Sequence, residues 1–338
     1  MVVCATTAAK LGRRRVIHLF AALGAGMLAG PARGRGPTPV LRSWSGSALG
    51  AEASIIVCHE DAFEAERLLG IALAEVRRLE AIFDLHRSDS AISRLNRRGV
   101  LANPPPEFVE LLRFAQRIAA LTDGAFDPTV QPLWELYAGH FARAGADPAG
   151  PPPGAVREAL ARTGWRRLVI EDACVRFADP RMALTLNGVA QGYITDRVAD
   201  LLRAAGMRSV LLDLGEVRGL GRHGSGRPWR VAVSDPEDPT RMVGRFALED
   251  RALAVSAAAG TRFDPAGRHH HLFDPRTGRS AALYRQVAVL APRAVLADAL
   301  STALYVMPPE MRVQLRGRFA EVEAFILRAD GGRERWKA

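Results

Sequence analysis

Two stretches near the carboxyl end of the chain carry residues whose types and spacing are suited to catalysis. The first is LADALSTALYVM at 296–307, an apolar stretch in which Asp298 and Thr302 stand four residues apart. In a helix this spacing places the carboxylate and the hydroxyl on one face, one turn apart. A carboxylate is rarely buried in an apolar helix unless a cation compensates its charge. The pair therefore indicates a hard metal ion; the alternative is that Asp298 is a helix N-cap or a salt-bridged surface acid.

The second stretch is HHHLFDPRTG at 269–278, in which a histidine is followed by an Asp-Pro turn and a glycine. His271 is the candidate general base, because an imidazole titrates close to working pH. The alternative is that His271 is an ordinary hydrogen-bonded histidine of a strand. A metal ion beside a proton-transfer residue is the equipment of phosphoryl transfer.

Two other motifs suggest a dinucleotide site and a zinc site, but neither meets the structural requirements of such a site. Residues 219–224 spell GxGxxG, but Ser225–Pro228 and a strand pattern follow where a dinucleotide site requires a helix, so such a site is excluded. The run 269–271 contains three consecutive histidines, yet a strand sends alternate side chains to opposite faces. The three cannot all bind one ion, and neither an HExxH motif nor a CxxC pair supports zinc.

Taken together, five segments resemble the ApbE family, the FAD:protein FMN transferases. They are RSDSAISRLN (87–96), TDGAFDPTVQPLW (122–134), LNGVAQGYITD (186–196), HLFDPRTG (271–278) and ADALSTAL (297–304). The resemblance extends over nearly all of the chain after its leader. A narrower resemblance links DLGEVR at 213–218 to family members from nitrous-oxide-reduction clusters.

The resemblance implies a reaction in which FMN is transferred from FAD to a Thr or Ser hydroxyl of a target flavoprotein and AMP is released. It implies Mg²⁺, which prefers hard oxygen ligands and keeps several waters or phosphate oxygens. Asp298 and Thr302 would supply two protein oxygens, and a backbone carbonyl near Gly188 would supply a third. His271 would be the catalytic base, and Asp274 would orient it or help to hold substrate.

The resemblance also implies a set of residues that contact FAD. Asp127 would accept a hydrogen bond from the nucleotide; equally, it would be a helix N-cap with Pro128 at the first helical position. His86 stands where the family often has an aromatic residue that stacks on the flavin, or it is only a surface loop residue. The expected FAD-binding residues are His86, Ala125, Phe126, Asp127, Thr185 and Gln191.

Three segments depart from the family pattern. Thr185 and Gln191 are neutral where the family has an acid and a lysine, Ala258-Ala259-Gly260 lacks two hydroxyls, and Gly215-Glu216 is one residue shorter. Each lost charge-assisted hydrogen bond weakens FAD binding by roughly 1.5–3 kcal/mol. Two alternatives to the transferase therefore stay open: a non-catalytic FAD-binding or delivery protein, and a Mg²⁺-dependent FAD pyrophosphatase.

The amino-terminal part is predicted to be a leader. Residues 1–32 contain Arg13–Arg15 before a short apolar run, which indicates a cleavable twin-arginine export signal and a periplasmic protein. The apolar run is too short to span a bilayer, so we expect no membrane span in the mature chain. Residues 33–48 are expected to be a flexible leader and 49–338 the catalytic domain. The formal charge of +10 comes without clusters of basic and aromatic residues, so nucleic-acid binding is not expected.

Periodicity predicts the elements that must position these residues. Apolar residues at helical spacing predict helices near 62–83, 108–121, 189–205 and 294–307. Strands are expected near 53–58, 168–170, 175–177, 183–186, 210–214, 229–234, 243–248, 253–256, 270–273 and 285–290. The pattern predicts an α+β fold of ApbE type, with a largely antiparallel sheet and flanking helices.

Overall fold

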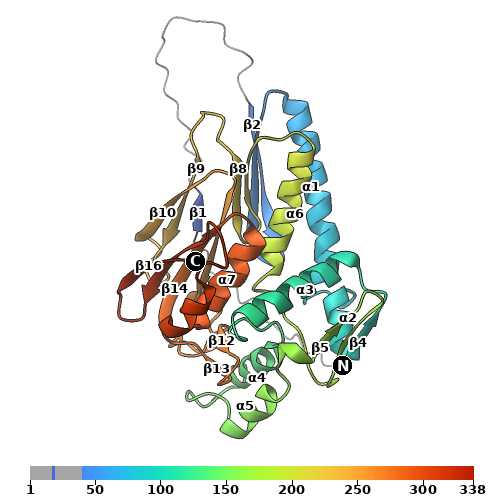
Figure 1. Ribbon diagram of the computed structural model, residues 1–338, viewed down its shortest axis with the longest axis vertical. Coiled ribbons are helices and arrows are strands. Elements are labelled where there is room, and N and C mark those ends of the chain that lie inside the picture. The colour runs from blue at the N-terminus through green and yellow to red at the C-terminus, as the bar shows by residue number, and fades with distance from the viewer. Residues whose placement is uncertain (1–16, 20–39) are drawn as a thin grey trace, which may run out of the picture.

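An eight-stranded antiparallel sheet lies at the centre of the computed structural model, which describes residues 17–19 and 40–338 (Figure 1). Its strand order is β16-β15-β14-β11-β8-β7-β3-β2. In chain order the strands are β2 (Val40–Ala48), β3 (Ala51–His59), β7 (Ser209–Asp213), β8 (Val217–Gly221), β11 (Arg251–Ala257), β14 (Tyr284–Ala291), β15 (Glu323–Arg328) and β16 (Arg333–Lys337).

Three helices cover one face of this sheet. α1 (Ala62–Phe83) packs on β2 and β3, α6 (Ala190–Ala204) packs on β7 and β8, and α7 (Ala294–Val306) packs on β11 and β14. α6 contacts both of the other helices. Buried aliphatic side chains from the helices and from alternate strand positions form one continuous core between the two layers.

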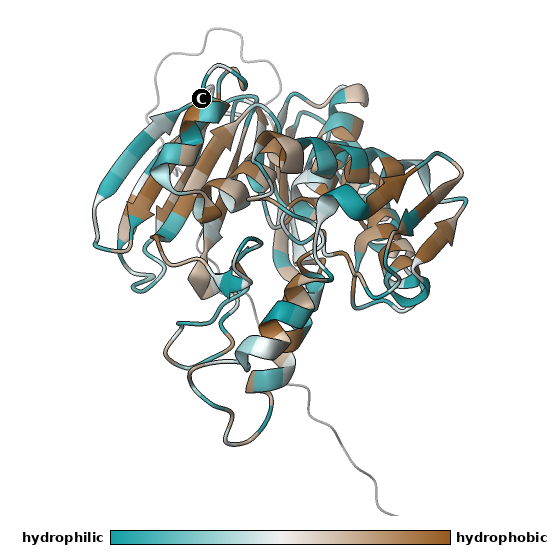
Figure 2. Cartoon of the chain, turned by 60° about the horizontal axis from the view of Figure 1, so that its bottom comes forward, coloured by the Kyte–Doolittle hydropathy of each residue, from teal (hydrophilic) through white to brown (hydrophobic). Residues whose placement is uncertain are grey.

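A smaller antiparallel sheet packs on the opposite face. It has the order β1-β9-β10 and consists of β1 (Ile17–Leu19), β9 (Trp229–Ser234) and β10 (Met242–Leu248). Because successive strand side chains point to opposite faces, Ile55 of β3 joins the core under the helices, whereas Ile56 joins a second cluster with Trp229. The central strands are therefore apolar on both faces, and they appear mostly brown in the hydropathy view (Figure 2).

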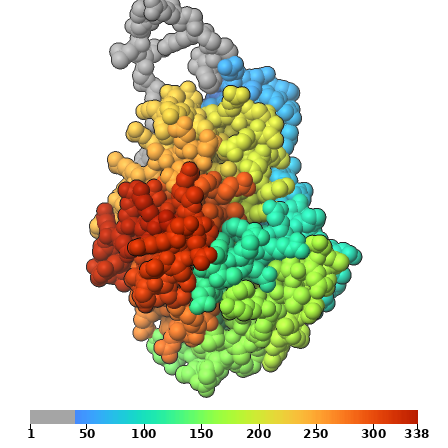
Figure 3. Space-filling view, in the orientation of Figure 1, coloured from blue at the N-terminus to red at the C-terminus, as the bar shows by residue number. Residues whose placement is uncertain are grey.

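The segment between α1 and α6 forms the remaining part of the fold and lies against the carboxyl-terminal elements, where α3 contacts α7 (Figure 3). A third hydrophobic cluster joins Leu133 and Tyr137 to Phe273. The elements are α2 (Ala91–Arg98), β4 (Val100–Ala102), α3 (Pro106–Leu121), α4 (Gln131–Phe141), α5 (Pro153–Leu160), β5 (Leu168–Ile170) and β6 (Cys174–Phe177), with the hairpin β12 (Phe273–Asp274) and β13 (Arg279–Ser280).

The predicted fold class, an α+β fold with a large antiparallel sheet, is confirmed, and the helix predicted at 62–83 has the observed bounds of α1. Asp61 caps this helix by accepting hydrogen bonds from the backbone N–H groups of Phe63 and Glu64. The helices predicted at 189–205 and 294–307 are α6 and α7, each within one residue of the predicted ends.

Three predictions about local structure need correction. Residues 40–48, assigned to the flexible leader, form β2, which pairs along its whole length with β3. Residues 183–186 form no strand, because the side-chain amide of Asn96 takes both backbone hydrogen bonds of Leu184. The strand predicted at 270–273 is reduced to an isolated bridge at His270 and the two residues of β12.

The predicted export signal lies outside the described residues, apart from Ile17–Leu19, which pair with β9 as strand β1. In the described part of the chain, every helix is too short or too polar to serve as a transmembrane span.

Candidate active site

Asp298 and Thr302 lie on one side of helix α7. Asp298 contacts α6 and Thr302 contacts β11. Asp298 is the fifth residue of the helix and its side chain is only 3% exposed, so it is neither an N-cap nor a surface acid. Its Oδ2 accepts a hydrogen bond of 3.1 Å from the backbone N–H of Gly192 at the start of α6. A buried carboxylate in an otherwise apolar helix requires such polar or cationic partners.

Gly188 lies directly beside Thr302, although the two residues are far apart in sequence. A Cβ atom built on Gly188 would lie 3.0 Å from the Thr302 hydroxyl oxygen and 3.4 Å from the Phe126 ring. The absence of a side chain at position 188 is therefore what allows this backbone to approach the hydroxyl. The fold thus brings together three of the predicted segments, 122–134, 186–196 and 297–304.

These residues fit a hard cation. Asp298 offers a carboxylate, Thr302 a hydroxyl and the backbone near Gly188 a carbonyl, and these are oxygen ligands of the kind Mg²⁺ prefers. Across residues 17–19 and 40–338 there is no group of three or more His, Cys, Asp and Glu side chains that could hold a metal ion. The nitrogen and sulfur set that zinc prefers is therefore absent from these residues, and Mg²⁺ bound here would keep water or phosphate oxygens as its other ligands.

Ser256 also lies at the candidate site, although no sequence motif indicated it. It stands on the helix-facing side of β11, is buried, and lies with its hydroxyl 2.7 Å from that of Ser301 and 3.4 Å from that of Thr302. Hydroxyl groups packed this closely constrain one another's rotamers. In the sequence, Ser256 is the one polar residue of the apolar run 252–257. The alternation of side chains along a strand does not show which residues of other elements Ser256 contacts.

His271 is held in the tautomer that a general base requires. Its Nδ1 lies 3.1 Å from the backbone carbonyl oxygen of Thr261, and its own backbone N–H donates to the same oxygen. A carbonyl can only accept, so in the neutral ring the proton is on Nδ1 and Nε2 is the basic nitrogen. The ring packs over Gly260, where an added Cβ would lie 3.1 Å from Cε1 of His271.

Asp274 does not orient His271 as the sequence analysis suggested. Its two oxygens are bound by the Arg276 guanidinium at 2.8 Å each, and it also accepts from the Arg276 backbone N–H. The orienting partner of His271 is the Thr261 carbonyl instead. A role for Asp274 in holding substrate stays a prediction.

His269 and His270, the other two histidines of the run 269–271, make packing and hydrogen-bond contacts within the fold. His269 packs on Tyr137 and Phe141. His270 is buried with its Nε2 3.0 Å from the Ala281 carbonyl oxygen, and burial lowers its pKa to about 4. The three histidine rings therefore have different surroundings.

The loop that contains Ala125, Phe126 and Asp127 is held in place by hydrogen bonds to the Asp127 carboxylate. Asp127 Oδ1 accepts from the backbone and hydroxyl of Thr129, and Oδ2 accepts from the Trp165 backbone at 3.1 Å. Burial raises the pKa of the Asp127 carboxyl against the effect of these hydrogen bonds. The N-cap alternative is wrong, because α4 begins only at Gln131. Ala125 and Phe126 are both buried, and direct contact between Asp127 and a nucleotide stays a prediction.

The other predicted FAD contacts occupy different surroundings. The Thr185 backbone N–H donates to the Pro128 carbonyl at 2.8 Å, which joins this residue to the same loop. Gln191 is buried at the start of α6, and a Cβ on Gly215 would lie 2.3 Å from its side-chain nitrogen, so the glycine makes room for this side chain. His86 is exposed between α1 and α2, and no hydrogen bond or ring contact of the described residues joins its ring to the others.

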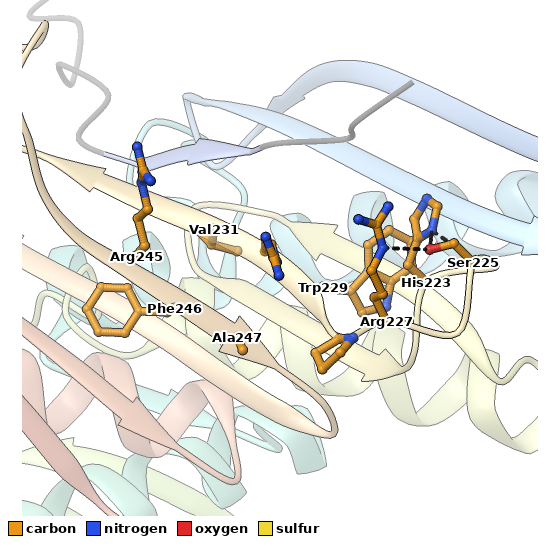
Figure 4. Close-up of a pocket in the computed structure, with 10 residues that line it drawn as sticks. His223, Ser225, Arg227, Trp229, Val231, Arg245, Phe246 and Ala247 are labelled. Atoms are coloured by element: carbon orange, nitrogen blue, oxygen red, sulfur yellow. Dashed lines mark hydrogen bonds between the residues drawn. The ribbon is translucent and has the colours of Figure 1, made fainter. Parts of the chain in front are cut away.

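A pocket on the far sheet takes no part in this arrangement. Figure 4 shows it on β9, β10 and the turn before β9, where Arg227 and His223 both contact the Ser225 hydroxyl. This turn follows the GxGxxG segment, and strand β9 begins at Trp229 where a dinucleotide site would have a helix. The exclusion of that site is therefore confirmed.

Comparisons with known proteins identify relatives of this chain. The ApbE family matches residues 49–326, which contain every predicted site residue. The FAD:protein FMN transferase of Treponema pallidum is 31% identical over 278 residues, covering 74% of this chain and 74% of its own. The Salmonella typhimurium protein of the same name is 28% identical over 309 residues, covering 88% of each chain.

Solved structures show the same fold. The crystal structure of the ApbE protein from Thermotoga maritima superposes with a TM-score of 0.77 at 26% identity, covering 88% of this chain and 97% of that one. The apo form of the Pseudomonas stutzeri flavinyl transferase ApbE gives a TM-score of 0.72 at 27% identity, covering 88% and 94%. On the extent of these matches, this chain belongs to the ApbE family.

Proposed function

We propose that this protein is a Mg²⁺-dependent FAD:protein FMN transferase of the periplasm. The observation that carries the proposal is the approach of Thr302 to Gly188 beside the Phe126 ring, with Asp298 one turn away on the same helix, in a chain whose relatives are named for this reaction. Asp298, Thr302 and the backbone near Gly188 would hold the Mg²⁺ ion, which would neutralise the pyrophosphate charge and stabilise the phosphoryl group being transferred.

The reaction breaks one phosphoanhydride bond and makes one phosphoester bond. The Thr or Ser hydroxyl oxygen of the acceptor protein bonds to the phosphorus of the FMN half of FAD, and the bond to the bridging oxygen breaks so that AMP leaves. The hydroxyl proton passes to Nε2 of His271, whose tautomer is set by Thr261. Phe126 and the loop pinned by Asp127 form the adjoining wall for the nucleotide.

The decisive experiment incubates the purified protein with FAD, Mg²⁺ and an acceptor flavoprotein, and follows both in-gel flavin fluorescence and the nucleotides released. We expect one AMP for each FMN attached. Asp298→Asn should abolish labelling, whereas Asp330→Asn, a matched change at an exposed acid paired with Arg328, should leave it intact. Unchanged labelling by Asp298→Asn would refute the metal assignment.

The same measurement separates the two alternatives. Tight FAD binding without AMP release identifies a delivery protein, and free FMN with AMP in the absence of acceptor identifies a pyrophosphatase. The neutral residues at Thr185 and Gln191 are the reason to measure FAD affinity as well, because both stand where the family resemblance implies a charge.

Two finer parts of the proposal have tests of their own. The basic residues before the apolar run at 19–29 support export by the twin-arginine route, so replacing Arg13 and Arg14 by Lys should trap the precursor in the cytoplasm. The DLGEVR segment at 213–218 supports the subfamily of nitrous-oxide-reduction clusters, which predicts labelling of an acceptor from such a cluster in preference to an unrelated flavoprotein.

A further inference from the structure

Helix α7, which carries both predicted metal ligands, does not cap its own amino terminus. Its N-cap residue is Arg293, whose side chain makes no capping hydrogen bond. The first backbone N–H groups of a helix lack partners within the helix and need an acceptor from elsewhere. Here the acceptor is Asp196 of α6, which takes the Ala294 N–H on Oδ1 at 2.9 Å and the Val295 N–H on Oδ2 at 3.0 Å.

The Asp196 carboxylate is fully buried, and two arginines compensate its charge. Arg218 of β8 donates to Oδ1, and Nε of Arg293 lies 3.1 Å from Oδ2. Because a guanidinium stays protonated in proteins, the two arginines place positive charge on either side of this carboxylate. An ionised carboxylate at a helix amino terminus also interacts favourably with the helix dipole.

A third hydrogen bond joins the same two helices, with its acceptor on α7 and its donor on α6. Asp298 of α7 accepts from the Gly192 N–H of α6, while Asp196 of α6 accepts from the first turn of α7. The helices touch at the backbone between these bonds, since a Cβ on Gly192 would lie 2.5 Å from the Ala294 carbonyl oxygen.

We infer that Asp196 is a positioning residue for the metal site: by capping α7 from α6, it sets where Asp298 and Thr302 stand relative to Gly188. The inference rests on the proposed function for the identity of the metal. Gly188 lies just before α6 and Thr302 lies on α7, so any slide of one helix along the other changes the separation of these two groups.

The test compares Asp196→Asn with Asp200→Asn. Asp200 pairs with the same arginines, at 3.6 Å from Arg218 and 2.9 Å from Arg293, and contacts neither amide of α7. For Asp196→Asn we expect a rise of roughly tenfold or more in the Mg²⁺ concentration that half-saturates FMN transfer, as for other residues that orient metal ligands. The rate at saturating Mg²⁺ should change less than this, and Asp200→Asn should leave both quantities within about twofold of wild type.

A measurement on the metal-free protein separates this inference from the proposed function. Amide hydrogen exchange at Ala294 and Val295 should accelerate in Asp196→Asn and stay slow in Asp200→Asn. If the wild-type protein transfers no flavin, the proposed function fails and the exchange result still decides whether Asp196 caps α7. If transfer and Mg²⁺ dependence are normal in Asp196→Asn, or the two variants behave alike, the inference is overturned.

The double variant Asp196→Asn/Arg293→Ser provides a rescue. Serine at the N-cap position, where the backbone is already extended, supplies a local acceptor and removes one of the two arginines that Asp196 neutralises. We expect Mg²⁺ half-saturation and α7 exchange to return to within about threefold of wild type. If Asp196→Asn alone does not fold, this double variant still tests whether Asp196 acts by capping α7. A double variant that still needs high Mg²⁺, still exchanges rapidly in α7 or still fails to fold overturns the inference.

Discussion

Replacing Gly188 with alanine tests the proposed metal site where the Gly188 backbone approaches Thr302. The new Cβ would lie 3.0 Å from the Thr302 hydroxyl oxygen and 3.5 Å from its methyl group, so the threonine must move by a few tenths of an ångström. The φ angle of Gly188 is outside the positive range, so alanine fits the local backbone and the effect comes from this contact.

The expected loss of Mg²⁺ affinity follows from the coordination geometry that the ion requires. Mg²⁺ requires near-ideal octahedral geometry, and a plausible ligand distance varies by only about 0.2 Å. A displacement of a few tenths of an ångström is therefore expected to raise the half-saturating Mg²⁺ concentration roughly 10- to 100-fold. This corresponds to about 1.4–2.7 kcal/mol of binding free energy.

The assay is the initial rate of FMN transfer titrated with Mg²⁺, together with the rise in melting temperature that Mg²⁺ produces without FAD. Gly70→Ala is the matched control: Gly70 is exposed inside α1 with open space around it, so alanine should stabilise the fold by roughly 0.5–1 kcal/mol and leave the titration unchanged. Adding Thr302→Ser to Gly188→Ala removes the methyl group and should recover part of the affinity. Wild-type Mg²⁺ dependence in Gly188→Ala would refute the assignment of Thr302 as a ligand.

Four further predictions concern the candidate base, the core and the hydroxyl network. His271→Gln should lower the rate of FMN transfer roughly 10²- to 10⁴-fold and leave FAD affinity intact, as measured by single-turnover labelling and flavin fluorescence titration. Burial lowers the pKa of His270 to about 4, below its value near 6.5 in the unfolded chain. The free energy of unfolding that the neutral ring contributes is therefore fully present above pH 6.5 and is lost as the pH falls towards 4. Urea unfolding should therefore show about 2 kcal/mol lost between pH 7 and pH 5 in wild type, and the loss should be absent in His270→Asn. Gly192→Ala should destabilise the fold by about 1–3 kcal/mol in the same assay, because the Cβ would lie 2.5 Å from the Ala294 carbonyl oxygen. Ser256→Ala should raise the half-saturating Mg²⁺ concentration roughly tenfold with little change in melting temperature, and an unchanged titration would rule out an orienting role.

Much of this protein can be predicted from patterns that are local in the sequence. The apolar positions of 62–83 and 294–307 repeat at helical spacing, which predicts α1 and α7 with nearly their observed ends. The same spacing predicts that Asp298 and Thr302 share one face of α7. β2 was missed because a half-exposed edge strand with a polar sequence resembles a leader in composition, and only its pairing with β3 reveals it.

The sequence by itself determined which chemical groups this protein has and, through the periodicity of α7, that a carboxylate and a hydroxyl stand together on one helix. Only the tertiary structure decided what surrounds them: Gly188 against Thr302, Ser256 beside it, the Thr261 carbonyl that fixes the tautomer of His271, and Asp196 at the start of α7. The physical reason is that a helix repeats within a few residues, whereas most of these contacts join groups tens of residues or more apart in the chain. Such contacts exist only after the two helices and the sheet have packed into one core.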